Sequence, residues 1–337
     1  MVDIWSLYAI MCVGDHMFSD IEKPKIKLRV RSDITSNVLK QKTKKVSYTF
    51  AADIKNSRYG DSSRWADLTA LLEKTRLSLN EVFEKSLEKE VVFSGGDSIQ
   101  GVFNRAESAF LYGRLLQKLF YPENIKVGIG IGEVFSYFEE KNSNYSTGQA
   151  FILAQGALSQ AKANDIDVQI WSYDDKTEEI NILLEMISVI RANQTDYQKE
   201  LDLMTEILFP FETLQMNIST FKIIEVIKFK NNLPTFKIEP TTDSNETRID
   251  RFINNLEEDR SSYIKPIFVN SFTNTRLSEL INQANIYGIQ SDIALLTGST
   301  KQNISKMFNK AKIEQLRKYD LVIFKKLGEM FNDYTIF

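Results

Sequence analysis

Glycine is distributed unevenly along this chain, and its distribution constrains the fold more than any other feature of the sequence. Of the 14 glycines, nine lie between positions 95 and 156, and none lies between 157 and 287. Glycine suits turns and close backbone contacts and weakens the interior of a helix. The pattern therefore predicts a glycine-punctuated α/β region that is followed by a mostly helical one.

The length and composition are those of a globular protein with real hydrophobic cores. A chain of 337 residues with 43% hydrophobic residues is expected to form two or three domains. The formal net charge of -3 gives no global reason to expect nucleic-acid or membrane binding. Any basic binding surface must therefore be local.

Cysteine and histidine are almost absent, which limits the possible metal chemistry. The single cysteine, Cys12, excludes an internal disulfide framework, and the single histidine, His16, excludes a zinc cluster of cysteine and histidine within the chain. Metal binding would have to use carboxylates. The apolar opening segment 1–18 carries Asp3 and is too short to span a bilayer, so we expect a cytoplasmic protein with no membrane partner.

Changes in composition divide the chain into five predicted parts. Residues 23–45 hold nine Lys or Arg and one Asp, which indicates a solvated basic arm or, alternatively, a nucleic-acid contact. Residues 238–250 are polar and rich in turn formers, which favours a linker. The predicted parts are a basic N-terminal arm at 1–45, an α/β domain at 46–175, a helical segment at 176–237, a linker at 238–265 and a C-terminal domain at 266–337.

The order of elements in the α/β domain predicts an α+β fold. The apolar patterns predict a strand at 46–54, a helix at 64–87, a hairpin at 91–103, a helix at 106–120, a strand at 125–138 and a helix at 147–165. This order suits a split βαβ sheet, the ferredoxin-like plan, with helices packed on it. Mostly helical domains are expected to follow.

Two aspartates mark a candidate metal site in this domain. Asp53 closes the first strand in "FAADI", and Asp97 lies in the turn of "VVFSGGDSIQGVF". If the two strands are neighbours, the carboxylates could hold Mg²⁺ or Mn²⁺ and serve phosphoryl transfer. The alternative is a plain hairpin with a turn residue and a strand-end cap. Gly95 and Gly96 would let the backbone approach a phosphate, and they equally suit the turn.

Four motifs of this region resemble a known fold family. "FAADIKNSR", "SGGDSIQGVF", "KVGIGIGE" and "GQAFILAQGALSQAKA" are similar, in order and spacing, to the palm-like domain of class III nucleotide cyclases and GGDEF diguanylate cyclases, and most closely to the SatD family of bacterial proteins. The resemblance covers about residues 48–165. It implies a cyclase-like palm fold that binds a nucleotide, with metal ions held by Asp53, the carbonyl of Ile54 and Asp97.

The chain also departs from that family pattern. Where class III cyclases have an Asn and an Arg that stabilise the transition state, this chain has Ile152 and Gly156. Ser98 replaces the second acid of the diguanylate cyclase signature. Arg58 and Arg64 are candidates for a phosphate contact, the alternative being a surface role. Catalytic residues are therefore unassigned, with Asp53 and Asp97 as the only candidates.

Near the C-terminus, residues 288–312 have the spacing of a helix-turn-helix. Ala294, Gly298 and Ile304 provide the small residue, the turn glycine and the buried residue that this motif needs. SatD relatives also end in a segment resembling a helix-turn-helix. The alternative is a helical hairpin used for packing or for homodimer formation. The predicted DNA-contacting residues on the second helix are Thr300, Lys301, Gln302, Asn303, Ser305, Lys306 and Lys310.

Two functions are consistent with these features. The first is a DNA-binding regulatory protein whose cyclase-like domain binds a nucleotide and a divalent metal as a signal. The second is an active nucleotide cyclase or nucleotidyltransferase that uses two-metal catalysis at Asp53 and Asp97. The intact helix-turn-helix spacing and the missing cyclase residues favour the first.

Overall fold

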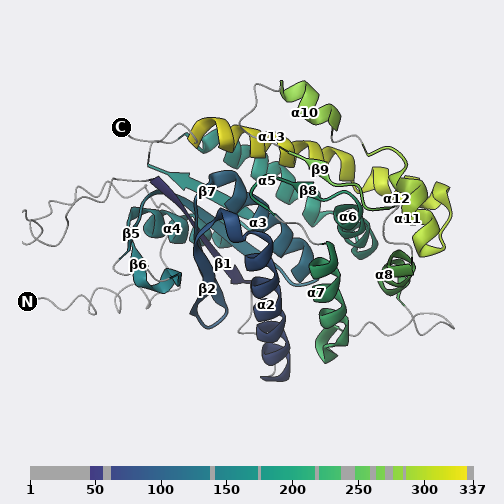
Figure 1. The fold of residues 1–337 in the computed structure, drawn as a ribbon, viewed down its shortest axis with the longest axis horizontal. Coiled ribbons are helices and arrows are strands. Elements are labelled where there is room, and N and C mark those ends of the chain that lie inside the picture. The colour runs from purple at the N-terminus through teal and green to yellow at the C-terminus, as the bar shows by residue number, and fades with distance from the viewer. Residues whose placement is uncertain are drawn as a thin grey trace, which may run out of the picture. The chain divides into compact units, whose positions relative to one another are not determined.

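The protein has an α+β fold in which a mixed five-stranded sheet is packed with helices and is followed by a largely helical C-terminal region (Figure 1). The structure is a computed structural model. It describes residues 46–55, 62–136, 141–173, 176–216, 220–236, 247–258, 263–269, 276–283 and 286–331. The predicted basic arm at 1–45, Arg58 and residues 238–246 and 259–262 of the predicted linker lie outside the described residues.

The central sheet has the strand order β2–β3–β1–β4–β7. Strand β1 pairs antiparallel with β3 on one side and with β4 on the other, and β7 pairs parallel with β4. The first strand of the sequence is therefore the middle strand of the sheet. The strands are β1 (Val46–Ile54), β2 (Leu87–Gly95), β3 (Ser98–Phe103), β4 (Ile125–Glu133) and β7 (Val168–Ser172).

The two faces of β4 carry different residues because each face receives a different helix. Val127 and Ile129 lie in the main core, where α2 (Ser62–Val82) and α3 (Ala106–Phe120) pack. The alternating glycines face α4 (Gln149–Ala163) instead. A Cβ on Gly130 would lie 2.0 Å from the carbonyl oxygen of Ala150. The glycines of "GIGIG" therefore allow the backbone of α4 to lie directly on the sheet.

The outer edge of β7 is covered by α5 (Glu178–Ala192). The Asn181 side chain accepts a hydrogen bond from the Ile170 amide and donates one to the Ile170 carbonyl. Ser188 Oγ accepts another from the Asp167 amide. These bonds satisfy backbone groups that an open sheet edge would otherwise expose to a second chain.

The C-terminal region is built from helices that follow α5. Short strands β8 (Phe211–Glu212) and β9 (Ile267–Phe268) pair in parallel within it, and β5 (Phe135–Ser136) pairs with β6 (Ser146–Thr147) beside the sheet. None of the described helices is long and apolar enough to cross a membrane. The helices are α6 (Asp196–Leu208), α7 (Thr220–Asn232), α8 (Arg248–Glu258), α10 (Leu277–Gln283), α11 (Ile289–Thr297), α12 (Lys301–Lys310) and α13 (Ile313–Phe331).

Most predicted elements of the α/β domain are present, although several bounds differ and some elements were not predicted. The helix predicted at 64–87 ends at Val82, because β2 already begins at Leu87. The strand predicted at 125–138 ends at Glu133. Strand β7 was not predicted. Helix α8 lies inside the segment predicted as a linker, and it buries one apolar face against the rest of the protein.

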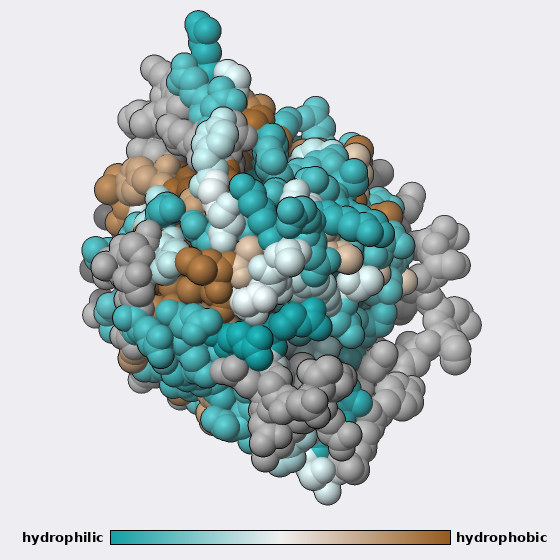
Figure 2. Space-filling model, turned by 90° about the vertical axis from the view of Figure 1, so that its right-hand side faces the viewer, coloured by the Kyte–Doolittle hydropathy of each residue, from teal (hydrophilic) through white to brown (hydrophobic). Residues whose placement is uncertain are grey.

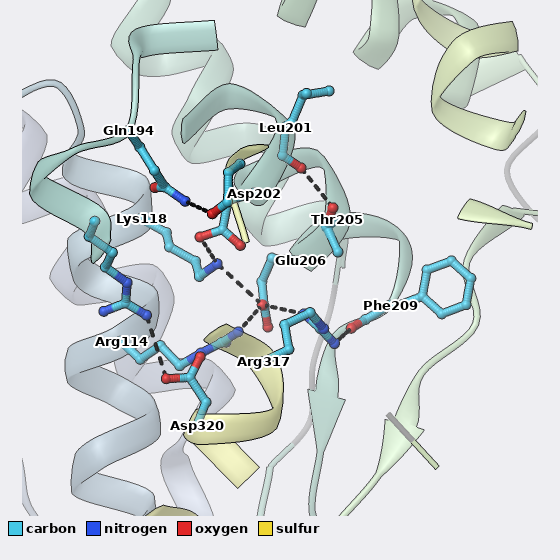
Figure 3. Close-up of polar contacts among 12 residues, drawn as sticks. Arg114, Lys118, Gln194, Leu201, Asp202, Thr205, Glu206, Phe209, Arg317 and Asp320 are labelled. Carbon is cyan, nitrogen blue, oxygen red and sulfur yellow. Dashed lines mark hydrogen bonds and ion pairs between the residues drawn. The ribbon is translucent and has the colours of Figure 1, made fainter. Parts of the chain in front are cut away.

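A buried network of charges joins the helix layer of the sheet to the C-terminal helices (Figure 3). Arg114 of α3 lies 2.5 Å from Glu206 of α6 and 2.5 Å from Asp320 of α13. Arg317 of α13 lies 2.8 Å from the same Glu206. All four side chains are at most 2% exposed. Lys118 of α3 extends the network to Asp202 of α6 at 2.5 Å.

The charges in this network compensate one another. Burial alone would raise the pKa of Glu206, but Arg114, Arg317 and Lys118 outweigh it and hold that pKa far below the usual value of 4.5. Burial lowers the pKa of Lys118 to about 8, with Asp202 opposing the shift. The ionised Glu206 therefore stabilises the fold at pH values above the pKa that this group has in the unfolded chain. The contribution is lost progressively as the pH falls from that value toward the lower pKa of the folded state.

We predict that Glu206→Gln lowers the free energy of unfolding by about 3–5 kcal/mol, because it leaves two buried guanidinium groups without their shared carboxylate. Glu314→Gln is the matched control, since Glu314 forms an ion pair with Lys318 on the exposed surface of α13. The control should change stability by less than about 1 kcal/mol. Urea denaturation at pH 7 measures both changes. Equal losses in the two variants would contradict the role of the network.

Candidate functional site

The end of β1 carries the first predicted metal ligand. Ala51 packs against Ala154 and Leu158 of α4. Side chains two residues apart on a strand point to the same face, so Asp53 points toward the side of the sheet that α4 covers. Ile54 is buried in the main core and offers only its carbonyl oxygen to a ligand.

Both carboxylate oxygens of Asp53 already have partners. Lys162 Nζ, from the last turn of α4, lies 2.7 Å from Asp53 Oδ1. Ser98 lies directly across from Asp53 in the register of β1 and β3, and its hydroxyl donates a hydrogen bond to Oδ2. The Asp53 side chain is 14% exposed. The first predicted ligand is therefore a half-buried carboxylate that is neutralised by a lysine.

Asp97 lies in the turn between β2 and β3, one residue before Ser98. The condition set for a shared site, that the two strands be neighbours, is met, because β1 pairs with β3, the strand that follows Asp97. Gly96 has φ +57°, a left-handed conformation that favours glycine. A Cβ on Gly95 would meet no atom within 4 Å, so a residue with a side chain would fit at position 95 without a clash.

Two further lysines balance the carboxylates at this end of the sheet. Lys126 lies across from Asp53 in the register of β1 and β4, and its ammonium is 2.8 Å from Asp165 and 3.1 Å from Asp167. Lys55 Nζ is 2.7 Å from Asp165. Hydrogen bonds from Lys126 and Lys55 lower the pKa of Asp165. Each of the three lysines at this end therefore has an aspartate partner.

This arrangement does not fit a two-metal centre. In the part of the chain that the structure describes, no group of three or more His, Cys, Asp or Glu could hold a metal ion. Mg²⁺ takes about six oxygen ligands, and at Asp53 it would first have to displace the Lys162 ammonium. Metal ligation by Asp53, Ile54 and Asp97 stays a prediction.

One candidate phosphate contact, Arg64, and the two positions that differ from class III cyclases, Ile152 and Gly156, have the following surroundings. Arg64 forms an ion pair with Glu123 at 2.7 Å. Ile152 is 54% exposed on α4. A Cβ on Gly156 would lie 2.3 Å from the ring of Trp171, so this glycine gives the indole room against α4. None of these contacts supplies a transition-state donor.

The second candidate site is formed by α11 and α12, which are joined by the short connection 298–300. Gly298 adopts φ 69°, the left-handed conformation that ends many helices. Thr300 caps α12, since its hydroxyl accepts a hydrogen bond from the Asn303 amide at 3.3 Å. The predicted DNA contact Thr300 therefore also has a structural role at the start of the helix.

Helix α12 buries one face and exposes the other. Ile304 and Phe308 are buried, and they pack with Ile293 and Ala294 of α11 in the hydrophobic core. Ser305 is half-buried. Residues 298–313 contain four lysines and no acid. The exposed residues along α12 and at its cap are Thr300, Lys301, Gln302, Asn303, Lys306, Asn309 and Lys310.

These two helices lie at the end of the molecule that is farthest from β5 and β6 in Figure 1. Figure 2 views that end directly, and hydrophilic residues cover most of it, with smaller hydrophobic patches between them. A basic helix face that lies open at one end of a protein can be approached by a large partner.

Two side-chain hydrogen bonds from other elements hold α11 and α12 in place. Asn255 of α8 donates to the carbonyl of Leu296 at the end of α11, at 2.8 Å. Gln194, which follows α5, donates to the carbonyl of Ala311 at the end of α12, at 2.7 Å. Neither residue was a predicted site residue, because the partners are 41 and 117 positions apart and no local pattern reveals such a contact.

Comparison with known proteins adds no family assignment. No protein-family model matches the chain, and no curated protein matches its sequence significantly.

We predict opposite outcomes for two glycines. Gly130→Ala should lower the free energy of unfolding by about 3 kcal/mol or more, because its Cβ would clash with the backbone of α4. Gly95→Ala should change stability by less than about 0.5 kcal/mol, because its Cβ meets open space. Thermal and urea unfolding of both variants make the comparison. A stable Gly130→Ala protein would show that α4 does not lie on the sheet as described.

Proposed function

We propose that this protein is a DNA-binding regulatory protein that inserts α12 into the major groove. The observation that carries the proposal is the exposed face of α12, which presents lysines and amides without any acid while the opposite face is buried. Lysines suit phosphates, and Gln or Asn suits base edges. An exposed face that combines lysines with amides provides the contacts that a recognition helix makes to phosphates and base edges.

The connection between α11 and α12 supports the same proposal. Ala294 is 6% exposed and Ile304 is fully buried, and Gly298 has the left-handed conformation that a tight turn needs. These are the three requirements of the helix-turn-helix spacing. Helices α6, α8 and α13 contact the pair from behind and leave the basic face open.

The electrostatics make binding dependent on this local surface. With a formal net charge of -3, the whole protein does not attract DNA. Four lysines within residues 298–313 provide the local positive charge. Each phosphate contact releases bound counterions, so binding should weaken steeply with added salt.

The sheet is proposed to be a palm-like domain of the cyclase type that senses a nucleotide. The order β2–β3–β1–β4–β7, with β1 in the middle, supports the split βαβ plan and the resemblance to the SatD family. The enzyme alternative is less well supported. Asp53, one of its two candidate catalytic residues, is held by Lys162 and Ser98, and Ile152 and Gly156 cannot replace the missing cyclase donors.

We predict that Lys306→Ala weakens the binding of the full-length protein to all DNA sequences. The loss of one phosphate contact should reduce the slope of log K against log salt by about 1. Lys141→Ala is the matched control, because Lys141 is an exposed lysine near β2, far from α12. Fluorescence anisotropy titrations between low and physiological salt measure the slopes. The same slope change in both variants would place the contact elsewhere.

Gln302→Ala is expected to behave differently from the lysine variant. Removal of a base-reading amide should cost about 1–3 kcal/mol on the preferred site and little on unrelated DNA. Competition titrations with the two kinds of DNA separate these effects. A uniform loss on all sequences would assign Gln302 to phosphate contact, and no loss on any sequence would remove α12 from the interface.

A further inference from the structure

The Asp53 carboxylate lies where the cyclase resemblance expects a metal, yet it has a fixed cationic partner. Lys162 Nζ lies 2.7 Å from Asp53 Oδ1, which is the distance of a charge-assisted hydrogen bond. Ser98 occupies the second oxygen. The pair is a contact between two separate elements, since Asp53 ends β1 and Lys162 lies in the last turn of α4.

Several features fix the lysine in this position. The backbone of α4 lies directly on β4, because Gly128 and Gly130 leave no side chain between them. This close contact sets the distance between the end of α4 and the end of β1. A lysine in the last turn also interacts favourably with the negative end of the helix dipole.

No neighbouring lysine in the described residues is paired in the same way with Asp53. Lys126 lies across the register from Asp53, but its ammonium is bonded to Asp165 and Asp167. Lys55 is bonded to Asp165. The local charge at Asp53 is therefore balanced by Lys162.

We propose that the Lys162 ammonium is a built-in cation that takes the place of a divalent metal ion at Asp53. The sheet domain then needs neither Mg²⁺ nor Mn²⁺ in order to fold or to bind a ligand. This inference goes beyond the proposed function and does not depend on DNA binding by α12. The proposal also counts against two-metal catalysis at Asp53, because the charge that would hold the metal is already balanced by Lys162.

The test is chemical complementation of Lys162→Met in the full-length protein. Removal of the ammonium leaves a half-buried carboxylate unpaired, and Mg²⁺ or Mn²⁺ should then bind to it. At about 10 mM, either metal should raise the melting temperature of the variant by about 2–4 °C, and it should not raise that of the wild type. Lys162 is 41% exposed, so the variant is expected to fold.

Two control variants make the result specific. Lys55→Met removes a neighbouring lysine that pairs with Asp165, and metal should not stabilise it through Asp53. The double variant Asp53→Asn/Lys162→Met removes the carboxylate as well, and the stabilisation by metal should disappear. The proposal would be overturned if metal stabilised the double variant as much as Lys162→Met. It would also be overturned if metal did not stabilise Lys162→Met at all.

A measurement on the wild type provides an independent test. Binding of Mn²⁺, followed by its electron paramagnetic resonance signal, should be the same for the wild type and for Asp53→Asn. Weaker Mn²⁺ binding in Asp53→Asn would show that Asp53 is a metal ligand in the native protein and would overturn the proposal. Neither result bears on the DNA titrations, so the two proposals can fail separately.

Discussion

One buried carboxylate, Glu206 of α6, joins the helix layer of the sheet to the C-terminal helix α13, because two arginines share it. Arg114 comes from α3, which packs on the sheet, and Arg317 comes from α13, which follows α12. The removal of three or more charges from water is costly, and only their mutual attraction and hydrogen bonds offset that cost. The network therefore favours the alignment of α3, α6 and α13 in which these buried charges are paired. The ring of Phe211 lies beside both guanidinium groups, and its centroid is 4.7 Å from Arg114 Cζ and 4.2 Å from Arg317 Cζ.

The same alignment determines how α12 is presented. Helix α12 contacts α6 and α13, and Gln194 holds the carbonyl of Ala311 at its end. At the far end of α13, the Tyr48 hydroxyl of β1 donates a hydrogen bond to the carbonyl of Phe331 at 2.7 Å. The basic helix face and the sheet are therefore parts of one packed structure.

The sequence predicted the elements whose pattern is local. Strand β1 and helix α3 have the predicted bounds, because an apolar β-branched run and a continuous apolar helix are clear signals. Strand β7 was missed because five residues that follow a helix give too short a pattern. Helix α8 was missed because the segment is polar on average, although Ile249, Phe252, Ile253 and Leu256 have helical spacing.

The contacts that define the sites depend on distant residues, and these could not be predicted. Asp53 was recognised as a candidate, but its partner Lys162 is far along the chain and was only one of the residues of a predicted helix. The network at Glu206 joins residues 92 and 111 positions apart. The exposed face of α12 could be predicted, because helical periodicity alone separates Ile304 and Phe308 from the lysines.

The claim that α12 reads DNA is tested most directly by selecting DNA from a random-sequence library with the full-length protein. The selection is done at about 0.15 M salt, where weak surface electrostatics are screened. If α12 reads DNA, the wild type enriches a defined sequence motif, and Gln302→Ala loses the preference at one or two positions of that motif. Sequences from the wild type that are indistinguishable from the unselected library would contradict the claim that α12 reads DNA.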